Sequence, residues 1–246
     1  MRKRLTGERG LSLVEVTIML LVLMLLTSVL APSIFDFVND AKWVKVKEDC
    51  EAIGLSVARL TRDVGTCLKF DGRQPCTMRN RVDMLYSDGP DVGYDNLGPH
   101  AVDFNSSAIY GGTLNWDMES HRGDSMEHQF VDNATGPAYP TPADLGTYAT
   151  PGPYFNLGWR GAYLSPPIAP DPWGNAYLVN SVFLSVAIDA PYGTGQGRRS
   201  GGWSHDTFCI SAGPNGIYET AFAGNRTGGV ERQGDDFIYV ISGDTR

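Results

Sequence analysis

The sequence predicts an α+β fold, with one long helix at the N-terminal end and a β-sheet formed from the C-terminal third. Three features predict this order: an apolar run near the start, an amphipathic continuation with helical spacing, and a turn-rich remainder that ends in short alternating strands. The 246 residues leave enough chain beyond the apolar run for one further domain.

The apolar run extends from Leu11 to Ala31 and contains a single charged residue, Glu15. Its 21 residues are close to the roughly 20 that a helix needs to cross a bilayer core, so we expect a membrane-spanning helix. A carboxylate near one end of such a helix costs up to roughly 2.5–3.5 kcal/mol on insertion, which favours a cationic partner.

A short basic segment, residues 1–10, precedes this run and ends in Gly10. Cleavage between Gly10 and Leu11 would create an α-amino group four residues from Glu15. The two groups could meet within one chain, whereas pairing between neighbouring chains would set an assembly register.

Charge predicts the orientation of the span. The whole chain carries −8, and because residues 1–10 have four basic side chains and one acidic one, the rest would be near −11. Basic residues before the span predict an N-terminus in the cytoplasm and the remainder outside. The acidic body has no basic stripe to neutralise phosphates, which argues against nucleic-acid binding.

The segment Arg9-Gly10-Leu11-Ser12-Leu13-Val14-Glu15 resembles the signal of type IV pilins and type II secretion pseudopilins. The resemblance implies that prepilin peptidase removes residues 1–10 on the cytoplasmic side, leaving the helix on the protein. Phenylalanine is the commoner first mature residue, so Leu11 departs from the pattern at the position that the family usually N-methylates. The small-residue cleavage site of an ordinary secretory signal is missing.

Residues 32–66 continue the helix as an amphipathic half, so one helix is predicted from about Leu11 to about Val64. Pro32 should kink or locally melt it, and Gly54 should weaken it. The resemblance implies that the first half packs in a filament core and the second half backs an antiparallel sheet. The alternative is an anchor with a coiled stalk, against which the lack of a sustained heptad counts. The apolar positions of the amphipathic half are Ile34, Phe37, Val38, Ala41, Val44, Ala52, Leu55, Ala58 and Leu60.

Residues 67–169 are rich in turn-forming residues and predict loops with short strands. The short apolar runs are 84–86, 108–110 and 162–164. The G-type pseudopilin is a much shorter protein, so we interpret this region as a loop-rich insertion, of the kind through which subunits gain specific contacts.

Residues 170–246 predict a β-sheet. Asp171-Pro172-Trp173-Gly174-Asn175 forms a turn that leads into a strand ending at Val179, followed by strands at 182–188, 207–211 and 237–242. This region is similar to the C-terminal end of the G-type major pseudopilin, where the same turn starts the sheet. There, a Gly-Pro-Asp-Gly-like turn and a downstream acidic pair enclose one calcium ion.

Calcium binds six to eight oxygen ligands, which turn-rich loops supply. We expect Asp235 and Asp236 as charged ligands and Asn215 as a neutral one, with Ser211 and local carbonyls completing the shell. Asn215 stands where the family often has aspartate. The alternative is that Asn215-Gly216 is a plain turn and the two aspartates lie at a solvated edge.

Four cysteines in an exported chain predict disulfides. Cys50 and Cys67 would be roughly 25 Å apart on one helix, too far to bond. Cys67 with Cys76 would close a small loop and is our first choice, whereas Cys50 with Cys209 would tie the helix to the sheet.

The sequence contains no Gly-x-Ser-x-Gly, HExxH or P-loop motif, so we do not expect an enzyme. The resemblance implies a structural subunit that forms a homopolymer with other pilin-like subunits at an inner-membrane assembly platform. The subunit would span the inner membrane once, with a periplasmic C-terminal domain, and then enter a periplasmic or extracellular filament. The alternatives are a minor tip pilin with an adhesive role and a membrane-anchored calcium-dependent periplasmic protein.

Overall fold

The computed structural model divides the chain into two compact units, Met1–Val44 and Lys45–Arg246. The structure describes residues 12–65, 68–70, 81–92, 96–97, 104–105, 113–114, 116, 123–145, 158–184, 206–222 and 230–242.

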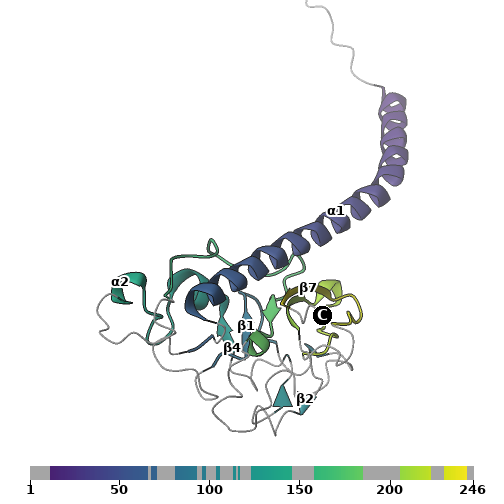
Figure 1. Cartoon of the computed structure of the whole chain (residues 1–246). Coiled ribbons are helices and arrows are strands. Elements are labelled where there is room, and N and C mark those ends of the chain that lie inside the picture. The colour runs from purple at the N-terminus through teal and green to yellow at the C-terminus, as the bar shows by residue number, and fades with distance from the viewer. Residues whose placement is uncertain are drawn as a thin grey trace, which may run out of the picture. The chain divides into compact units, whose positions relative to one another are not determined.

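One helix, α1 (Leu13–Val64), extends over 52 residues and contributes to both units (Figure 1). The prediction of a single long helix is therefore confirmed. Pro32 lies inside α1 and the helix continues past it, so local melting, one of the two predicted effects, does not occur, whereas the kink stays a prediction. Helix formation is cooperative, and the long helical stretches on both sides offset the loss of one N–H donor.

The second part of α1 packs on the sheet through side chains spaced three or four residues apart. The buried stripe is Val46, Cys50, Ile53, Val57 and Leu60. The predicted apolar face was wrong at Ala52, Leu55 and Ala58, which are exposed, and right at Leu60. The stripe that packs on the sheet includes a cysteine, and a prediction based on hydrophobic pattern alone gives little weight to cysteine.

Gly54 also faces the sheet. A Cβ atom at this position would lie 2.7 Å from Cε1 of Tyr239 and 3.3 Å from Cγ1 of Ile241, so the missing side chain allows strand and helix to approach closely. The glycine expected only to weaken the helix therefore has a packing role.

A mixed five-stranded sheet has the order β4-β1-β5-β6-β7, and two further strands form a separate pair. The bounds are β1 (Met84–Tyr86), β2 (Phe104–Asn105), β3 (Thr113–Leu114), β4 (Gly123–Ser125), β5 (Leu178–Val179), β6 (Thr207–Ser211) and β7 (Phe237–Ser242). The antiparallel prediction holds for β1–β5, β5–β6 and β6–β7 but is wrong for β1 and β4, which pair in parallel. Parallel neighbours require a long connection, and the chain between these two strands provides one.

The predictions for individual strands had mixed success. Strands β6 and β7 occupy the predicted ranges, whereas β5 covers only the last two residues of its predicted segment. Residues 182–184, predicted as a strand, lie in a 3₁₀ helix, η3 (Ser181–Leu184), and the rest of that segment lies outside the described residues. The other short elements are a π-helix, η2 (His128–Asp132), a helical turn, α2 (Pro142–Leu145), and a 3₁₀ helix, η4 (Gly213–Asn215).

Apolar side chains cover both faces of the sheet. Along β6, Cys209 joins the core on the α1 side, and its neighbours Phe208 and Ile210 join a second core. Strands β1 and β5 alternate in the same way, with Leu85 and Val179 on the α1 side. All five residues of β6 are buried, because the second face is covered by loop side chains such as the fully buried Trp116.

The region interpreted as an insertion contributes to this fold. It supplies β1 and β4, and a buried polar network begins in β4. Asp124 accepts a hydrogen bond from Nε2 of Gln129 at 2.6 Å, and Tyr139 donates to Oε1 of Gln129 at 2.9 Å. Part of residues 67–169 is therefore integral to the domain core.

Candidate functional site

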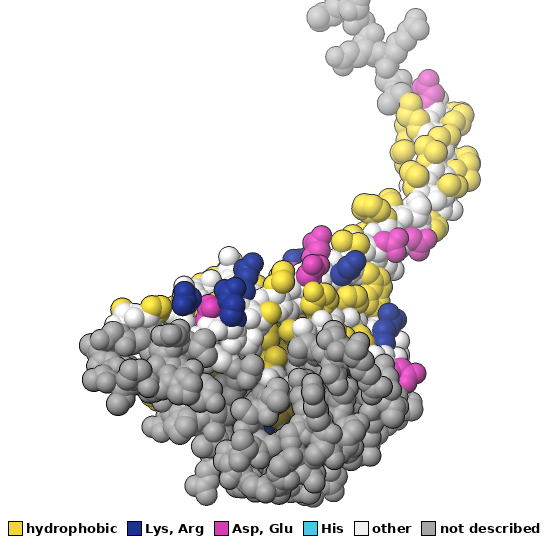
Figure 2. All heavy atoms as spheres, viewed as in Figure 1, with side chains coloured by type: hydrophobic (Ala, Val, Ile, Leu, Met, Phe, Trp, Pro, Cys, Tyr) yellow, Lys and Arg dark blue, Asp and Glu magenta, His cyan; other side chains and the backbone are white. Residues whose placement is uncertain are grey.

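The first part of α1 carries an exposed apolar surface. An 18-residue window has a mean hydropathy of 2.6, and none of it is buried. Figure 2 shows hydrophobic side chains covering this part of the helix. In the described part of the chain, α1 is the one helix long and apolar enough to cross a membrane, and as an N-terminal segment it also fits a signal sequence.

Three hydroxyl groups in this segment donate hydrogen bonds to carbonyls of the helix itself. The hydroxyl of Thr17 donates to the Val14 carbonyl at 2.8 Å, that of Thr27 to the Leu23 carbonyl at 2.8 Å, and that of Ser33 to the Leu30 carbonyl at 2.9 Å. Polar groups satisfied inside the helix suit an apolar surrounding. These three side chains therefore do not oppose burial of the surface in lipid or among other helices.

Glu15 caps the start of α1. Its Oε2 accepts a hydrogen bond from the Ser12 backbone N–H at 3.0 Å, and the Ser12 hydroxyl accepts one from the Val14 N–H at 3.3 Å. Ser12 and Glu15 have the three-residue spacing of a capping box. This local role was missed in the sequence interpretation, although the Ser-x-x-Glu pattern signals it. The predicted cleavage residues, Gly10 and Leu11, lie outside the described residues.

The candidate calcium loops lie at the end of β6 and before β7. Strand β6 leads into η4, where Gly213 and Gly216 adopt left-handed backbone angles with φ of 67° and 71°. A Cβ atom on Gly213 would lie 2.6 Å from the Asp235 carbonyl oxygen, so glycine permits the two loops to touch.

Both predicted acidic ligands lie at this contact, and each has one oxygen bonded to the backbone. Oδ2 of Asp236 accepts N–H bonds from Glu219 at 2.8 Å and Thr220 at 2.6 Å, and Oδ2 of Asp235 accepts one from Asn215 at 3.2 Å. The other oxygen, Oδ1, of each aspartate is buried without a hydrogen-bond partner among the described residues. Such orphaned carboxylate oxygens suit a cation.

Burial raises the pKa of Asp236 to about 6, against hydrogen bonds from Thr220 and Glu219 that lower it, and the charge of Glu219 adds to the rise. Burial and the neighbouring Glu219 charge thus disfavour the charged form of Asp236. A bound cation would remove that penalty.

The structure changes the expected ligand set. Ser211 donates to Oδ2 of Asp171 at 2.7 Å, and Oδ1 of Asn215 accepts the Ile217 N–H at 2.7 Å, so both side chains have other partners. Glu219 was missed, although it follows Asn215 by four residues. Its Oε2 accepts from Asn215 Nδ2 and from the Asp235 N–H, both at 3.3 Å.

These acids do not form a closed cage. Within the described residues, no three His, Cys, Asp or Glu side chains are arranged to hold a metal ion. Asp235 and Asp236 fit a cation through their orphaned oxygens, whereas Ser211 does not fit. To complete its coordination shell, calcium would need backbone carbonyl ligands and a rotation of the Glu219 side chain.

The turn that precedes β5 bonds to the same loops. Oδ1 of Asp171 accepts the N–H groups of Trp173 at 2.9 Å and Asn175 at 2.8 Å, as expected of a turn aspartate. Asn175 Nδ2 then donates to the Gly213 carbonyl at 2.8 Å. The two motifs singled out in the sequence are thus in direct contact.

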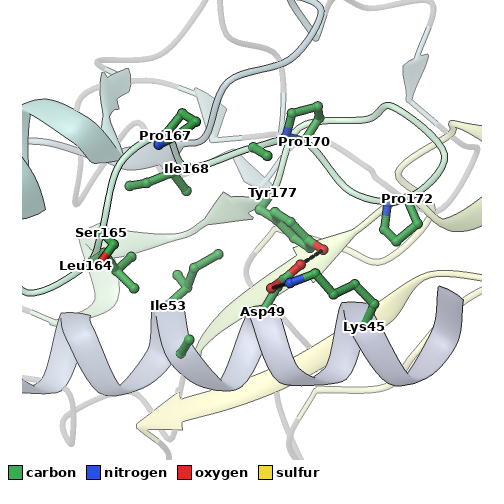
Figure 3. A pocket seen from close by; sticks show the side chains of 12 residues that line it. Lys45, Asp49, Ile53, Leu164, Ser165, Pro167, Ile168, Pro170, Pro172 and Tyr177 are labelled. Atoms are coloured by element: carbon green, nitrogen blue, oxygen red, sulfur yellow. Dashed lines mark hydrogen bonds and ion pairs between the residues drawn. The ribbon is translucent and has the colours of Figure 1, made fainter. Parts of the chain in front are cut away.

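A pocket of about 390 Å³ lies between α1 and the proline-rich segment before β5 (Figure 3). At its floor, Tyr177 donates to Oδ2 of Asp49 at 3.0 Å, and Lys45 pairs with Oδ1 of Asp49 at 2.5 Å. Burial, and then the Asp49 charge, raise the pKa of Tyr177 well above its ordinary value. Both carboxylate oxygens of Asp49 therefore have a partner, so the charge of this side chain is not left unpaired at the floor of the pocket.

The predicted disulfide residues divide into two groups. Cys50 and Cys209 are buried and free, with sulfur atoms 3.3 Å apart. Cys67 and Cys76, the first choice from sequence, lie outside the described residues.

Comparisons of the chain with protein-family models, with curated proteins and with solved structures found no match. Function is therefore inferred from the residues of this chain.

Proposed function

We propose that this chain is a structural, non-enzymatic filament subunit, processed by prepilin peptidase after Gly10 and assembled through the apolar half of α1. The observation that carries the proposal is the contrast between the two parts of α1. The apolar side chains of the first part are not buried, whereas the second part has a stripe of buried side chains. An apolar surface this long needs lipid or other helices to cover it. Identical helices of other copies supply such a cover in a polymer.

The proposed location follows from charge. The basic leader stays in the cytoplasm, α1 crosses the inner membrane, and the acidic domain lies in the periplasm before assembly. The partners are copies of itself, other pilin-like subunits, the peptidase and an inner-membrane assembly platform. A secretion pseudopilus or a pilus-like filament both fit this arrangement.

Glu15 has two candidate roles, and one pair of variants separates them. Its carboxylate caps α1 within the chain, and it can also pair with the α-amino group of Leu11 in a neighbouring copy. Glutamine retains the capping hydrogen bond but has no charge. Glu15→Gln therefore tests the charge, and Glu15→Ala removes both functions.

The experiment is in vivo crosslinking and negative-stain imaging of envelope fractions from cells that express the full chain. We expect cleavage to continue and polymer to be lost in both variants, with Glu51→Gln, on an exposed part of the same helix, as the matched control. Polymer formed by Glu15→Gln but lost in Glu15→Ala would assign Glu15 to capping alone. A wild-type chain that stays monomeric would refute the filament proposal and favour an anchored protein.

We further propose that the loops around η4 bind one calcium ion, with Asp235 and Asp236 as the charged ligands and Glu219 and Asn215 nearby. The two orphaned, buried carboxylate oxygens support this. Calcium titrated against the detergent-solubilised chain should raise its melting temperature. The rise should disappear in Asp235→Asn/Asp236→Asn and persist in the exposed control Asp91→Asn. No rise in the wild type would favour the plain-turn interpretation.

A minor tip subunit with a binding role is the second candidate, and the pocket beside Tyr177 favours it. A tip subunit would be present in a few copies per filament, so quantitative mass spectrometry of sheared filaments distinguishes the two. A stoichiometry near that of the main subunit would exclude the tip role.

A further inference from the structure

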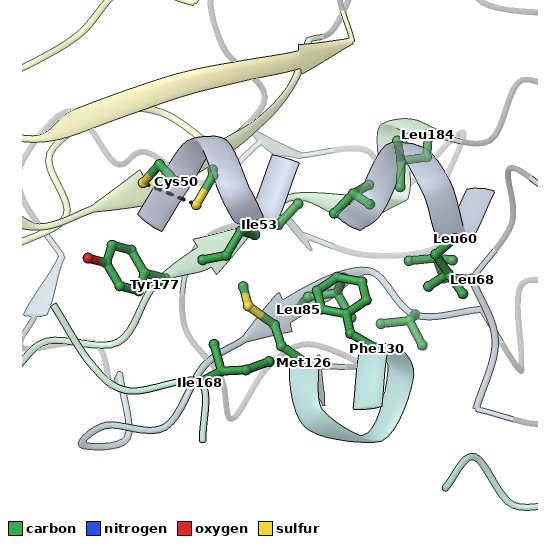
Figure 4. Packing of buried hydrophobic residues seen from close by; sticks show 14 of the residues in the cluster. Cys50, Ile53, Leu60, Leu68, Leu85, Met126, Phe130, Ile168, Tyr177 and Leu184 are labelled. Carbon is green, nitrogen blue, oxygen red and sulfur yellow. Dashed lines mark hydrogen bonds between the residues drawn. The ribbon is translucent and has the colours of Figure 1, made fainter. Parts of the chain in front are cut away.

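Two buried thiols lie between the helix and an inner strand of the sheet. Cys50 lies on the buried stripe of α1, Cys209 lies in β6, and their sulfur atoms are 3.3 Å apart (Figure 4). Neither side chain has any exposed surface. The two residues are separated by 159 positions in the chain.

The backbone around both residues is fixed by regular structure. Cys209 pairs with Val179 of β5 and Tyr239 of β7, so it lies inside the sheet. Cys50 is in the middle of a helix whose neighbouring stripe residues, Val46 and Ile53, belong to the same core. Two sulfur atoms held together by two rigid elements are well placed for a covalent link.

We propose that Cys50 and Cys209 form a disulfide in the exported protein and thereby link α1 covalently to β6. The two thiols give up two protons and two electrons to a donor disulfide of the oxidising compartment. The donor is reduced to a dithiol in two exchange steps through a mixed disulfide. The proposal rests on export of the domain but not on filament assembly.

Burial determines when this bond forms. Desolvation, followed by the contact with Cys209 and the charges of Asp49 and Asp171, raises the pKa of the Cys50 thiol. The thiolate is the species that attacks a disulfide, so exchange in the closed core is slow. The bond therefore forms while the core is still open during folding, and the folded core then shields it from reductants.

The link closes most of the domain into one covalent loop. Helix α1 contributes its stripe at one end of this loop, and β6 lies far along the chain. A cross-link that closes a long loop lowers the entropy of the unfolded chain more than one that closes a short loop. The Cys67–Cys76 pair would close a much shorter loop, so the two candidate disulfides differ in their expected effects on stability.

The test uses the full chain, extracted from membranes in mild detergent, with Cys67→Ser/Cys76→Ser as a background that leaves only the two core cysteines. The protein is denatured without reductant, treated with an alkylating agent and analysed by mass spectrometry. We expect no alkylation and a cross-linked peptide pair that contains Cys50 and Cys209. Alkylation of both cysteines would overturn the proposal.

Stability supplies an independent readout. Complete reduction, performed under denaturing conditions and followed by refolding, should lower the melting temperature by about 5–15 °C relative to the oxidised chain. Cys50→Ala/Cys209→Ala should show no dependence on oxidation, which separates the bond from cavity effects. Reductant added to the folded chain should leave the cross-link intact. Equal melting temperatures for the oxidised and reduced chains would contradict the proposed link.

The Glu15 variants, which test assembly, should retain the cross-link, so the two proposals can fail separately.

Discussion

The two parts of α1 are one helix with opposite surfaces. Between Leu13 and Val44 the large apolar side chains other than Trp43 are exposed, whereas between Lys45 and Val64 a narrow stripe is buried and the other positions are mostly polar. Helix formation by itself does not require either surface, because backbone hydrogen bonds follow the same pattern in both parts apart from the donor missing at Pro32. The side chains therefore assign the first part to an environment outside the domain and the second part to the domain core.

Aspartate substitutions in the two parts of α1 should have different effects. Val57→Asp buries an unpaired carboxylate against the sheet and should destabilise the domain by about 4 kcal/mol or more, enough to unfold it. Leu25→Asp, at an exposed position, should leave the domain folded but weaken membrane insertion by about 3 kcal/mol. Near-UV circular dichroism and membrane fractionation of the full chain measure these outcomes. A folded Val57→Asp domain would contradict the assignment of the stripe.

Titration of Asp236 should produce the next largest effect. Its pKa is raised from 3.8 to about 6 in the folded chain, so the folded state binds the proton more tightly than the unfolded state does. In calcium-free buffer, stability should therefore fall as pH rises from about 4 to about 7, by up to about 3 kcal/mol at 1.4 kcal/mol per pKa unit. Denaturant unfolding of wild type and Asp236→Asn at each pH isolates this contribution. Identical slopes would contradict it.

Gly54→Val tests the close approach of α1 and β7. The added side chain would meet the Tyr239 ring, so we expect a loss of about 1–3 kcal/mol despite the low helix propensity of glycine. Thermal unfolding measures the loss, and the exposed Leu55→Val on the same turn is the matched control. A stability gain in Gly54→Val would show that helix propensity outweighs packing here.

Lys45→Met should have the smallest effect. The Lys45 side chain is 60% exposed, and a solvent-exposed ion pair contributes about 0.2–0.5 kcal/mol. Asp49 keeps its hydrogen bond from Tyr177 in this variant. Unfolding in low and high salt measures the change, and a loss above 2 kcal/mol would mean that the pair is stronger than an exposed one.

The parts of the fold dictated by local pattern could be predicted from the sequence. The bounds of α1, β6 and β7 follow from helical spacing and from short alternating apolar segments. The parallel pairing of β1 with β4 could not be predicted, because it depends on contacts between distant residues. The prediction assigned several wrong residues to the buried stripe for the same reason, since the sheet determines which face of an amphipathic helix is covered.

The candidate site was predictable to a similar degree. The motif predicted Asp235 and Asp236 as ligands, which stays a prediction, but it did not indicate Glu219, which accepts the N–H of Asp235 from 16 positions earlier in the chain. Ser211 was predicted as a ligand, yet its hydroxyl bonds to Asp171, a partner 40 residues earlier. Partner choice among polar side chains depends on the folded geometry, which local sequence does not specify.

The continuity of α1 through Pro32 has a mechanical consequence. Because α1 stays helical past Pro32, a pull on its first part meets no non-helical segment before it reaches the second part. The buried stripe from Val46 to Leu60 extends over about 21 Å, at about 1.5 Å per residue, and a force along this part of the helix axis loads its contacts in shear. Contacts loaded in shear share the force and yield together, whereas contacts that are peeled yield one at a time.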